Sequence, residues 1–196
     1  MPSLEAVCGR LFGKPGWVPK ALVGGLLSFV PFLNLLALGF LMEYGHRLRS
    51  RGTWELPDWR EVNLPELLTE GFRGFVLLLG YIGIPLLAGW LVSGMIDILT
   101  FGLLGIVSFF PLAATGFVAP FLFLSSLNAY LRDGIFSDCW QLRPIIANAK
   151  NLWPKMALPI IAFWGILLLA LPLYGFSFFI GTWVLIAYST TLQFSD

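Results

Sequence analysis

Charged residues are scarce in this chain of 196 residues: they make up 12% of it, against about 25% in ordinary soluble domains. Apolar residues make up 58%, and the mean hydropathy is +0.83. A water-soluble protein of this composition would expose large apolar patches and would aggregate. The shortage of charge therefore excludes an ordinary soluble domain and predicts an integral membrane protein.

Residues that usually carry chemistry are also few. The two cysteines, Cys8 and Cys139, match neither a metal site nor a disulfide scaffold. The HExxH, GxSxG, P-loop and dinucleotide-binding glycine patterns do not occur. We therefore predict a protein that is not an enzyme and has no metal and no cofactor apart from bound lipids. His46 is the single candidate to bind a pigment or haem, but no second ligand accompanies it. The net charge of +1 gives no reason to expect a nucleic-acid partner.

The few basic residues divide the chain into apolar tracts. Lysine and arginine occur only in residues 10–20, 47–73 and 132–155. The apolar tracts that follow these blocks are residues 21–42, 74–131 and 156–195. Because a spanning helix needs about 20 residues, the second tract holds two full spans, near 75–95 and 101–126.

Proline breaks the other two tracts. The first contains FVPFLN, with Pro31 and Asn34, and is too short to cross twice. We predict a shallow re-entrant hairpin there, with a single kinked span as the alternative. The third contains LPLYGF, which predicts a hairpin of two short helices at 157–171 and 176–192. The predicted fold is an all-α integral membrane protein with about four or five membrane-embedded segments.

Two polar residues inside the tracts could have a role within the membrane, Asn34 and Asp97. A charge at the bilayer centre would cost roughly 2.5–3.5 kcal/mol on insertion scales. We therefore place Asp97 at the far turn between the two spans, where its side chain caps the next helix. A pore or a contact with a partner is the alternative role.

A repeated pattern links the three tracts. An amphipathic stripe at residues 4–12, 64–75 and 142–153 precedes each tract, and it predicts a helix lying in the plane of the headgroups. A helix packed on a soluble core is the alternative. A tyrosine then ends each tract, where hydrocarbon meets water: Tyr44, Tyr130 and Tyr188. We therefore predict three degenerate units, residues 1–52, 53–134 and 135–196.

Aromatic and basic side chains flank these units and are predicted to lie at the membrane interface. They are Trp17, Lys20, Tyr44, Arg47, Arg49, Arg51, Trp54, Pro57, Trp59, Tyr130, Arg132, Trp153 and Lys155. Because basic residues favour the cytoplasmic side, all three basic blocks are expected on that side of a prokaryotic cytoplasmic membrane. We expect no cleaved signal peptide, since no A-x-A site follows the first tract.

The loop after the first tract carries the most distinctive motif. Either Gly39-Phe40 or Tyr44-Gly45 begins it, a run of arginines leads to Gly52, and Leu56-Pro57-Asp58-Trp59 follows, with Gly71 at the end. This order resembles a family of uncharacterised multi-pass membrane proteins of bacteria and archaea, described only as a domain of unknown function. Many relatives carry Asp after the Trp, whereas Arg60-Glu61 stand here. The resemblance implies a multi-pass membrane protein and brings no known activity.

These observations favour a non-enzymatic membrane protein that organises or shapes the bilayer, or an accessory subunit of a larger membrane complex. A small transporter or channel for a lipid-like or small solute is the alternative. A membrane enzyme that uses the acidic residues of the loop is a third interpretation. The expected partners are membrane lipids and either further copies of the chain or a larger membrane complex.

Overall fold

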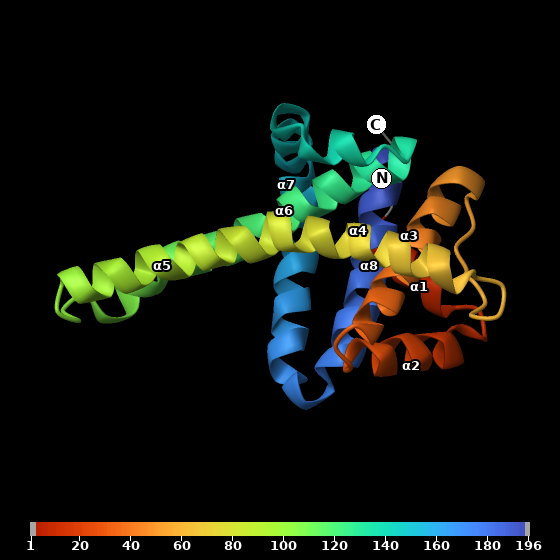
Figure 1. Ribbon diagram of the computed structural model, residues 1–196, viewed down its shortest axis with the longest axis horizontal. Coiled ribbons are helices and arrows are strands. Elements are labelled where there is room, and N and C mark those ends of the chain that lie inside the picture. Colours follow the sequence, from red (N-terminus) through yellow and green to blue (C-terminus); the bar gives the residue numbers. More distant parts are fainter. Residues whose placement is uncertain (1–2, 195–196) are drawn as a thin grey trace.

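The computed structural model describes residues 3–194, and every regular element in that range is helical (Figure 1). The helices are α1 (Leu4–Phe12), α2 (Trp17–Ser28), α3 (Leu33–Arg51), α4 (Leu64–Leu78), α5 (Ile84–Leu99), α6 (Phe110–Asp133), α7 (Leu142–Leu169) and α8 (Tyr174–Phe194). Four stretches are long and apolar enough to cross a membrane: Leu64–Leu99, Gly105–Asp133, Leu142–Leu169 and Leu171–Gln193. The chain is an all-α membrane protein, as its composition predicts.

Both predicted proline breaks separate helices. α2 ends at Ser28 and α3 begins at Leu33, with Phe32 between them in a left-handed conformation at φ 68°. Two helices therefore replace the single kinked helix considered for the first tract. With 12 residues, α2 is too short to cross a bilayer alone, because a span needs about 20. The second break is the 3-10 turn Leu171–Leu173, which separates α7 from α8.

Two predicted boundaries between a surface helix and a span are wrong. α4 continues through the π-helical turn Leu79–Gly83 into α5, so one helical stretch runs from residue 64 to residue 99. α7 has 28 residues and passes Pro154 and Pro159 without ending, so the predicted surface helix at 142–153 is continuous with the first helix of the third tract. Only α1 stands as a separate amphipathic helix, because the chain turns before α2 at Gly16, which takes φ 111°.

Neighbouring side chains explain why α7 survives its prolines. Proline removes one backbone hydrogen bond and crowds the preceding turn. Trp153, next to the first proline, stacks on Phe121 of α6 with ring centroids 4.8 Å apart. Pro159 is itself buried. The packing of these residues against other helices offsets the local cost.

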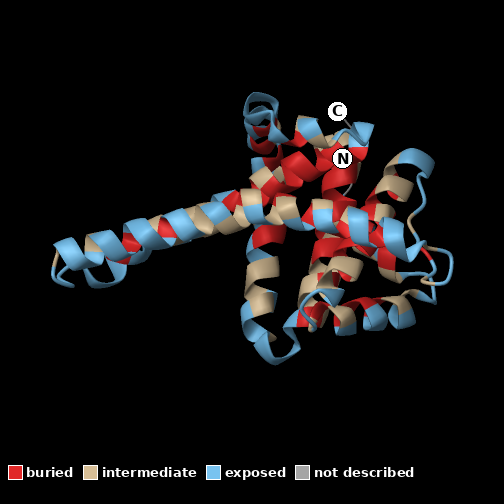
Figure 2. Ribbon diagram, viewed as in Figure 1, coloured by how far each residue is buried: buried red, intermediate tan, exposed pale blue. Residues whose placement is uncertain are grey.

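The α5–α6 hairpin projects from the rest of the molecule as an arm, and α7 and α8 extend together in another direction (Figure 1). Figure 2 shows that the arm is mostly exposed, whereas buried residues gather where the other helices meet. Exposed large apolar side chains of the arm include Ile84, Leu87, Trp90, Leu91, Met95, Ile98, Leu99, Phe101, Leu103, Ile106, Phe109 and Phe110. Within the arm the helices touch closely, since Ser93 Oγ accepts a hydrogen bond from the Leu112 amide at 3.2 Å. Lipid is the solvent that such a surface requires.

The hairpins α2–α3, α5–α6 and α7–α8 close into a ring. We call α3, α6 and α8 the return helices. Each return helix packs against the helix that leads into the next hairpin. α3 packs against α4, which continues into α5, and α6 packs against α7. α8 packs against α1 and α2. The last hairpin thereby contacts the first, so the two halves of the chain share one core.

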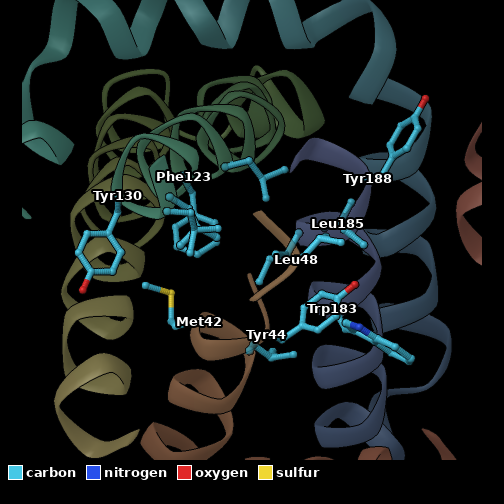
Figure 3. Close-up of a cluster of buried hydrophobic side chains, with 14 of the residues drawn as sticks. Met42, Tyr44, Leu48, Phe123, Tyr130, Trp183, Leu185 and Tyr188 are labelled. Carbon is cyan, nitrogen blue, oxygen red and sulfur yellow. The ribbon is translucent and has the colours of Figure 1, made fainter. Parts of the chain in front are cut away.

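The return helices meet in that core. A Cβ atom on Gly45 of α3 would lie 2.7 Å from Leu131 of α6 and 3.4 Å from Ile186 of α8. Tyr44 lies edge-on to Trp183 with ring centroids 6.0 Å apart (Figure 3). Tyr44, Tyr130 and Tyr188 are all buried. Their rings therefore pack within the protein, and their predicted level, where hydrocarbon meets water, stays a prediction.

Glycine brings α3 and α4 into backbone contact. A Cβ atom on Gly39 would lie 2.0 Å from the Leu67 carbonyl oxygen of α4. Reciprocally, a Cβ atom on Gly71 would lie 1.8 Å from the Leu35 carbonyl oxygen of α3. Small residues allow this close approach, which is how helices associate in lipid, where apolar burial provides little drive.

The glycine crossing predicts the effect of adding one methyl group. Gly39→Ala or Gly71→Ala should lower the free energy of unfolding by about 1–3 kcal/mol, because the two backbones must separate. Unfolding in detergent micelles, followed by circular dichroism, measures the loss. Gly94→Ala and Gly165→Ala are matched controls, since a Cβ atom at either helical position meets nothing within 4 Å. Equal stability of the crossing variants and the controls would contradict the close contact.

A candidate binding site at the ends of the return helices

A polar cavity of about 460 Å³ lies where α3, α6 and α8 end and α7 begins. Its volume falls within the roughly 300–1,000 Å³ of small-molecule sites. The side chains that matter most are Arg49 of α3, Asn128 and Arg132 of α6, Asn148 and Asn151 of α7, and Gln193 of α8. Guanidinium and amide groups therefore dominate the polar lining, and they offer many hydrogen-bond donors to a ligand.

The two arginines of the cavity lie close enough to influence each other. Arg49 Nη1 donates to Gln193 Oε1 at 3.0 Å, which ties α3 to α8. Arg132 donates to the Asp133 carboxylate from Nε at 2.9 Å and from Nη2 at 2.7 Å. Burial lowers the pKa of the Arg49 guanidinium, the charge of Arg132 lowers it further, and Asp133 acts in the opposite sense. Both arginines remain charged at neutral pH, because a guanidinium pKa starts far above it.

Asn128 is a buried lining residue with an unsatisfied group. Only 1% of the surface of Asn128 is exposed. Thr190 Oγ1 donates to Asn128 Oδ1 at 3.3 Å, but Asn128 Nδ2 has no hydrogen-bond acceptor among the described residues. Leaving a buried donor unsatisfied costs about 1–3 kcal/mol. An acceptor atom of a bound ligand would remove that cost.

A second polar cluster ties α4 to α6 and α3. Glu70 accepts hydrogen bonds from Tyr130 Oη and from Arg73 Nη1, each at 2.7 Å. Arg73 Nη1 also donates to Tyr130 Oη at 2.8 Å. His46 Nε2 lies 3.8 Å from Glu70 Oε2, and its ring is edge-on to Tyr130. These groups satisfy one another, so the cluster acts as a cross-brace, and it accounts for the place of His46 without a pigment.

The other arginines at the end of α3 have different surroundings. Arg47 Nε donates to Glu43 Oε1 at 2.7 Å, one turn earlier on the same helix, and Arg47 Nη1 lies 3.8 Å from Glu61 Oε2 of the loop. Arg51 is exposed at the last position of α3. No group of three or more metal-ligating side chains occurs among the residues that the structure describes.

An apolar cavity of about 450 Å³ lies further along α7 and α8, beside α1. Cys8 and Phe12 of α1, Ala162 and Ile166 of α7, and Phe176 and Ile180 of α8 contribute to its lining. This composition suits a hydrocarbon chain and offers almost no hydrogen bond. The polar and apolar cavities are thus both lined in part by α7.

Comparison with known proteins identifies the family. The model of the family described as "Protein of unknown function (DUF4013)" matches residues 23–189. The chain belongs to the DUF4013 family. No curated protein and no solved structure gives a significant match. The matched range includes the polar cavity except Gln193, and all of the cluster around Glu70.

The Leu-Pro-Asp-Trp segment of this DUF4013 member folds back onto α2 and α3. Leu56 and Pro57 are buried, and the Asp58 carboxylate accepts a hydrogen bond from the Arg60 amide at 3.1 Å. Trp59 stacks on Phe40 with ring centroids 3.8 Å apart, and its Nε1 donates to the Lys20 carbonyl oxygen at 3.1 Å. One face of the Trp59 ring is therefore covered by protein. We call the segment Leu56-Pro57-Asp58-Trp59 the clasp, because it closes the first hairpin.

The remaining predicted interface residues divide between packed and exposed positions. Lys20 Nζ donates to the Leu56 carbonyl oxygen at 2.7 Å, which reinforces the clasp. Trp17 packs against Phe12 and Trp183, and the Arg10 guanidinium lies 5.1 Å from the centre of the Trp54 ring. Lys155 is partly buried in α7. Trp17 and Trp54, which were predicted to lie at the membrane interface, therefore also make contacts within the protein.

The two polar residues of the tracts lie apart from the cavity. Asp97 is exposed in the last turn of α5, near the end of the arm, so its predicted role as a cap of the next helix is wrong. The next helical turn begins after Leu104 instead. Asn34 lies in the first turn of α3, and its Oδ1 has no hydrogen-bond partner among the described residues.

Sequence reasoning missed most of the polar cavity. Arg49 and Arg132 were predicted as interface residues, but Asn128 and Gln193 were not singled out. The signal for Asn128 was an amide inside a long apolar helix, since polar residues within membrane helices usually face the protein interior. Gln193 gave no comparable signal, because it stands near the end of the chain among ordinary helix residues.

The clasp predicts a loss of stability when its tryptophan is removed. Trp59→Ala should lower the free energy of unfolding by about 3 kcal/mol, because the stacked ring and the hydrogen bond to Lys20 are both lost. Unfolding in detergent monitored by circular dichroism gives the difference. Trp90→Ala is the matched control, since Trp90 is 60% exposed on the arm and should change stability little in detergent. A Trp59 variant as stable as the control would show that the clasp does not hold the hairpin.

Proposed function

We propose that this DUF4013 member is a non-enzymatic membrane scaffold that organises and shapes the bilayer around its hairpins. The observation that carries the proposal is the divergence of two apolar hairpins from one core, the α5–α6 arm and the α7–α8 pair (Figure 1). Spanning helices are tilted by roughly 0–40° from the bilayer normal. Two hairpins that point in different directions from a shared core cannot both lie close to the bilayer normal. The surrounding lipid must therefore thin, tilt or bend.

The charge pattern supports one orientation of the scaffold. Arg47, Arg49 and Arg51 end α3, Arg132 ends α6, and the arm carries no basic residue between residues 74 and 131. The positive-inside rule then favours the ends of the return helices in the cytoplasm and the tip of the arm outside. The cytoplasmic membrane of a prokaryote is the compartment that we propose on this basis.

The polar groups of the arm support a scaffold over a transporter. Thr115 Oγ1 donates to the Pro111 carbonyl oxygen at 3.0 Å, and Ser108 Oγ donates to the Gly105 carbonyl oxygen at 2.8 Å. Ser93 accepts from the Leu112 amide. These hydrogen bonds use the three hydroxyl groups within the hairpin. The exposed apolar sides of the arm also offer contact area to lipid, to a second copy or to a partner subunit in a larger complex.

Reconstitution tests the shaping activity. Purified protein inserted into vesicles at rising protein-to-lipid ratios should reduce vesicle diameter or draw out tubules, measured by electron cryomicroscopy. Leu87→Lys combined with Trp90→Lys should abolish the effect, because each lysine on the lipid-facing side costs about 2.5–3.5 kcal/mol to insert. Ile135→Lys combined with Leu142→Lys is the control, since it adds the same charge at exposed apolar positions outside the arm. Unchanged vesicles at every ratio of the unaltered protein would refute the proposal.

Cysteine labelling tests the orientation. In a background of Cys8→Ser and Cys139→Ala, Thr100→Cys near the arm tip should react with an impermeant maleimide on intact cells. Ser50→Cys at the end of α3 should react only after the cells are opened. Cys8 of the otherwise unaltered chain should behave like Ser50→Cys. Labelling of Ser50→Cys from outside would reverse the proposed orientation.

A further inference from the structure

We propose that the polar cavity at the ends of the return helices binds the phosphate-bearing, zwitterionic headgroup of a membrane phospholipid. This inference rests on the proposed membrane function and names a ligand for it. The cavity uses only the last turns of α6, where the arm joins the core, so the two proposals can fail independently. Its chemistry, its charge and its position along α7 each point to this class of ligand.

The donors of the cavity suit a phosphodiester. Arg49 and Arg132 enter from α3 and α6, and guanidinium groups bind phosphate oxygens in a fixed geometry. The amides of Asn148 and Asn151 add donors from the first part of α7. A phosphate accepts several hydrogen bonds at once, which matches a lining with this excess of donors.

Asn128 gives an independent sign of a missing ligand atom. Asn128 is one of the residues that line the cavity, and its buried Nδ2 donor has no acceptor among the described residues. Buried polar groups are satisfied in most proteins, so an orphan donor beside a cavity needs an explanation. A phosphate or ester oxygen held in the cavity would supply the acceptor.

Charge balance favours a zwitterion over a strongly anionic headgroup. Asp138 also lines the cavity, and Asp133 is bound to Arg132. Two arginines are therefore matched by two aspartates, and the site as a whole is close to neutral. A phosphoethanolamine headgroup fits this arrangement, because its phosphate pairs with arginine while its ammonium pairs with a carboxylate such as Asp138.

The position along α7 favours a lipid over a soluble phosphate. Asn148 and Asn151 of the polar cavity share one helical face with Ala162 and Ile166 of the apolar cavity, since their spacing follows three- and four-residue steps. From Asn151 to Pro159, where the apolar lining of α7 begins, the helix rises about 12 Å. A headgroup at the first cavity thus has a hydrocarbon-lined surface within reach of its acyl chains.

Lipid titration of the detergent-solubilised full chain, followed by native mass spectrometry, tests the site. Phosphatidylethanolamine should bind to the unaltered protein with a measurable Kd and raise its unfolding temperature. Arg49→Gln combined with Arg132→Gln should weaken binding at least about tenfold, through loss of charge-assisted hydrogen bonds. Arg51→Gln combined with Arg60→Gln removes the same charge from exposed positions outside the cavity and should leave the Kd within about twofold.

Arg49 also donates a hydrogen bond to Gln193, so its replacement could weaken binding by disturbing the fold. A second variant separates the two effects. Asn148→Leu combined with Asn151→Leu changes only half-buried or exposed positions on the rim and should weaken binding without altering the circular dichroism of the lipid-free protein. Equal binding of all variants would overturn the site. Equal stabilisation by diacylglycerol would overturn the role of phosphate, and stronger binding of phosphatidylglycerol would overturn the zwitterion.

Soluble probes identify the source of the phosphate. Glycerophosphoethanolamine and inorganic phosphate should bind much more weakly than the lipid, and a full effect of either would overturn the lipid assignment. Vesicle reshaping separates this inference from the scaffold. If the Arg49 and Arg132 double variant still reshapes vesicles but has lost lipid binding, both proposals stand. If the unaltered protein binds lipid at this site but leaves vesicles unchanged, only the scaffold falls.

Discussion

The backbone contact between α3 and α4 at Gly39 and Gly71 is the constraint on which the arrangement of the hairpins depends. Lipid tails are as apolar as leucine, so helices in a membrane associate through close packing more than through burial of apolar surface. At this crossing each helix presents a glycine to a carbonyl oxygen of the other, which leaves little freedom in their spacing. Because α4 continues into α5, the crossing also fixes the direction in which the arm leaves the core.

The ring of hairpins gives the proposed repeat a physical meaning. Each return helix packs on the helix that opens the next hairpin, and α8 completes the ring on α1 and α2. A chain of three related units, residues 1–52, 53–134 and 135–196, would produce this pattern if each unit offered one surface to the unit before it and one to the unit after it. Tyr44, Tyr130 and Tyr188 are consistent with the proposal, since each lies in the second half of a return helix and all three are buried. The proposed units differ in length, because the second contains the long arm.

Sequence patterns predicted the class of fold and most breaks, but not the internal surfaces. Apolar length predicted membrane helices, and Pro31 and Pro172 marked real helix ends. Pro154 did not end α7, because Trp153 is held by Phe121, a contact that no local pattern reveals. The burial of the three tyrosines could not be predicted for a similar reason: an amphipathic ring suits both a headgroup layer and a protein core. Arg49 and Arg132 could be recognised as basic residues at helix ends, but the meeting of Arg49 with Arg132 and Asn128 depends on two helices, α3 and α6, that are distant in the chain.

In the proposed scaffold, a core that fixes the directions of its hairpins also determines how the surrounding lipid must be arranged. The cross-brace around Glu70 and the glycine crossing join the first hairpin to the second, and the clasp around Trp59 closes the first hairpin itself. In the proposed scaffold, the softer bilayer adjusts where the exposed arm meets it. The same geometry leaves a gap where the return helices end, because helices that converge on a core from different directions cannot fill every space between their last turns. That gap is lined by arginine and amide groups at the level where apolar surface gives way to charge, which is where a phospholipid carries its own phosphate. Shape and lipid recognition would then be two consequences of one packing arrangement.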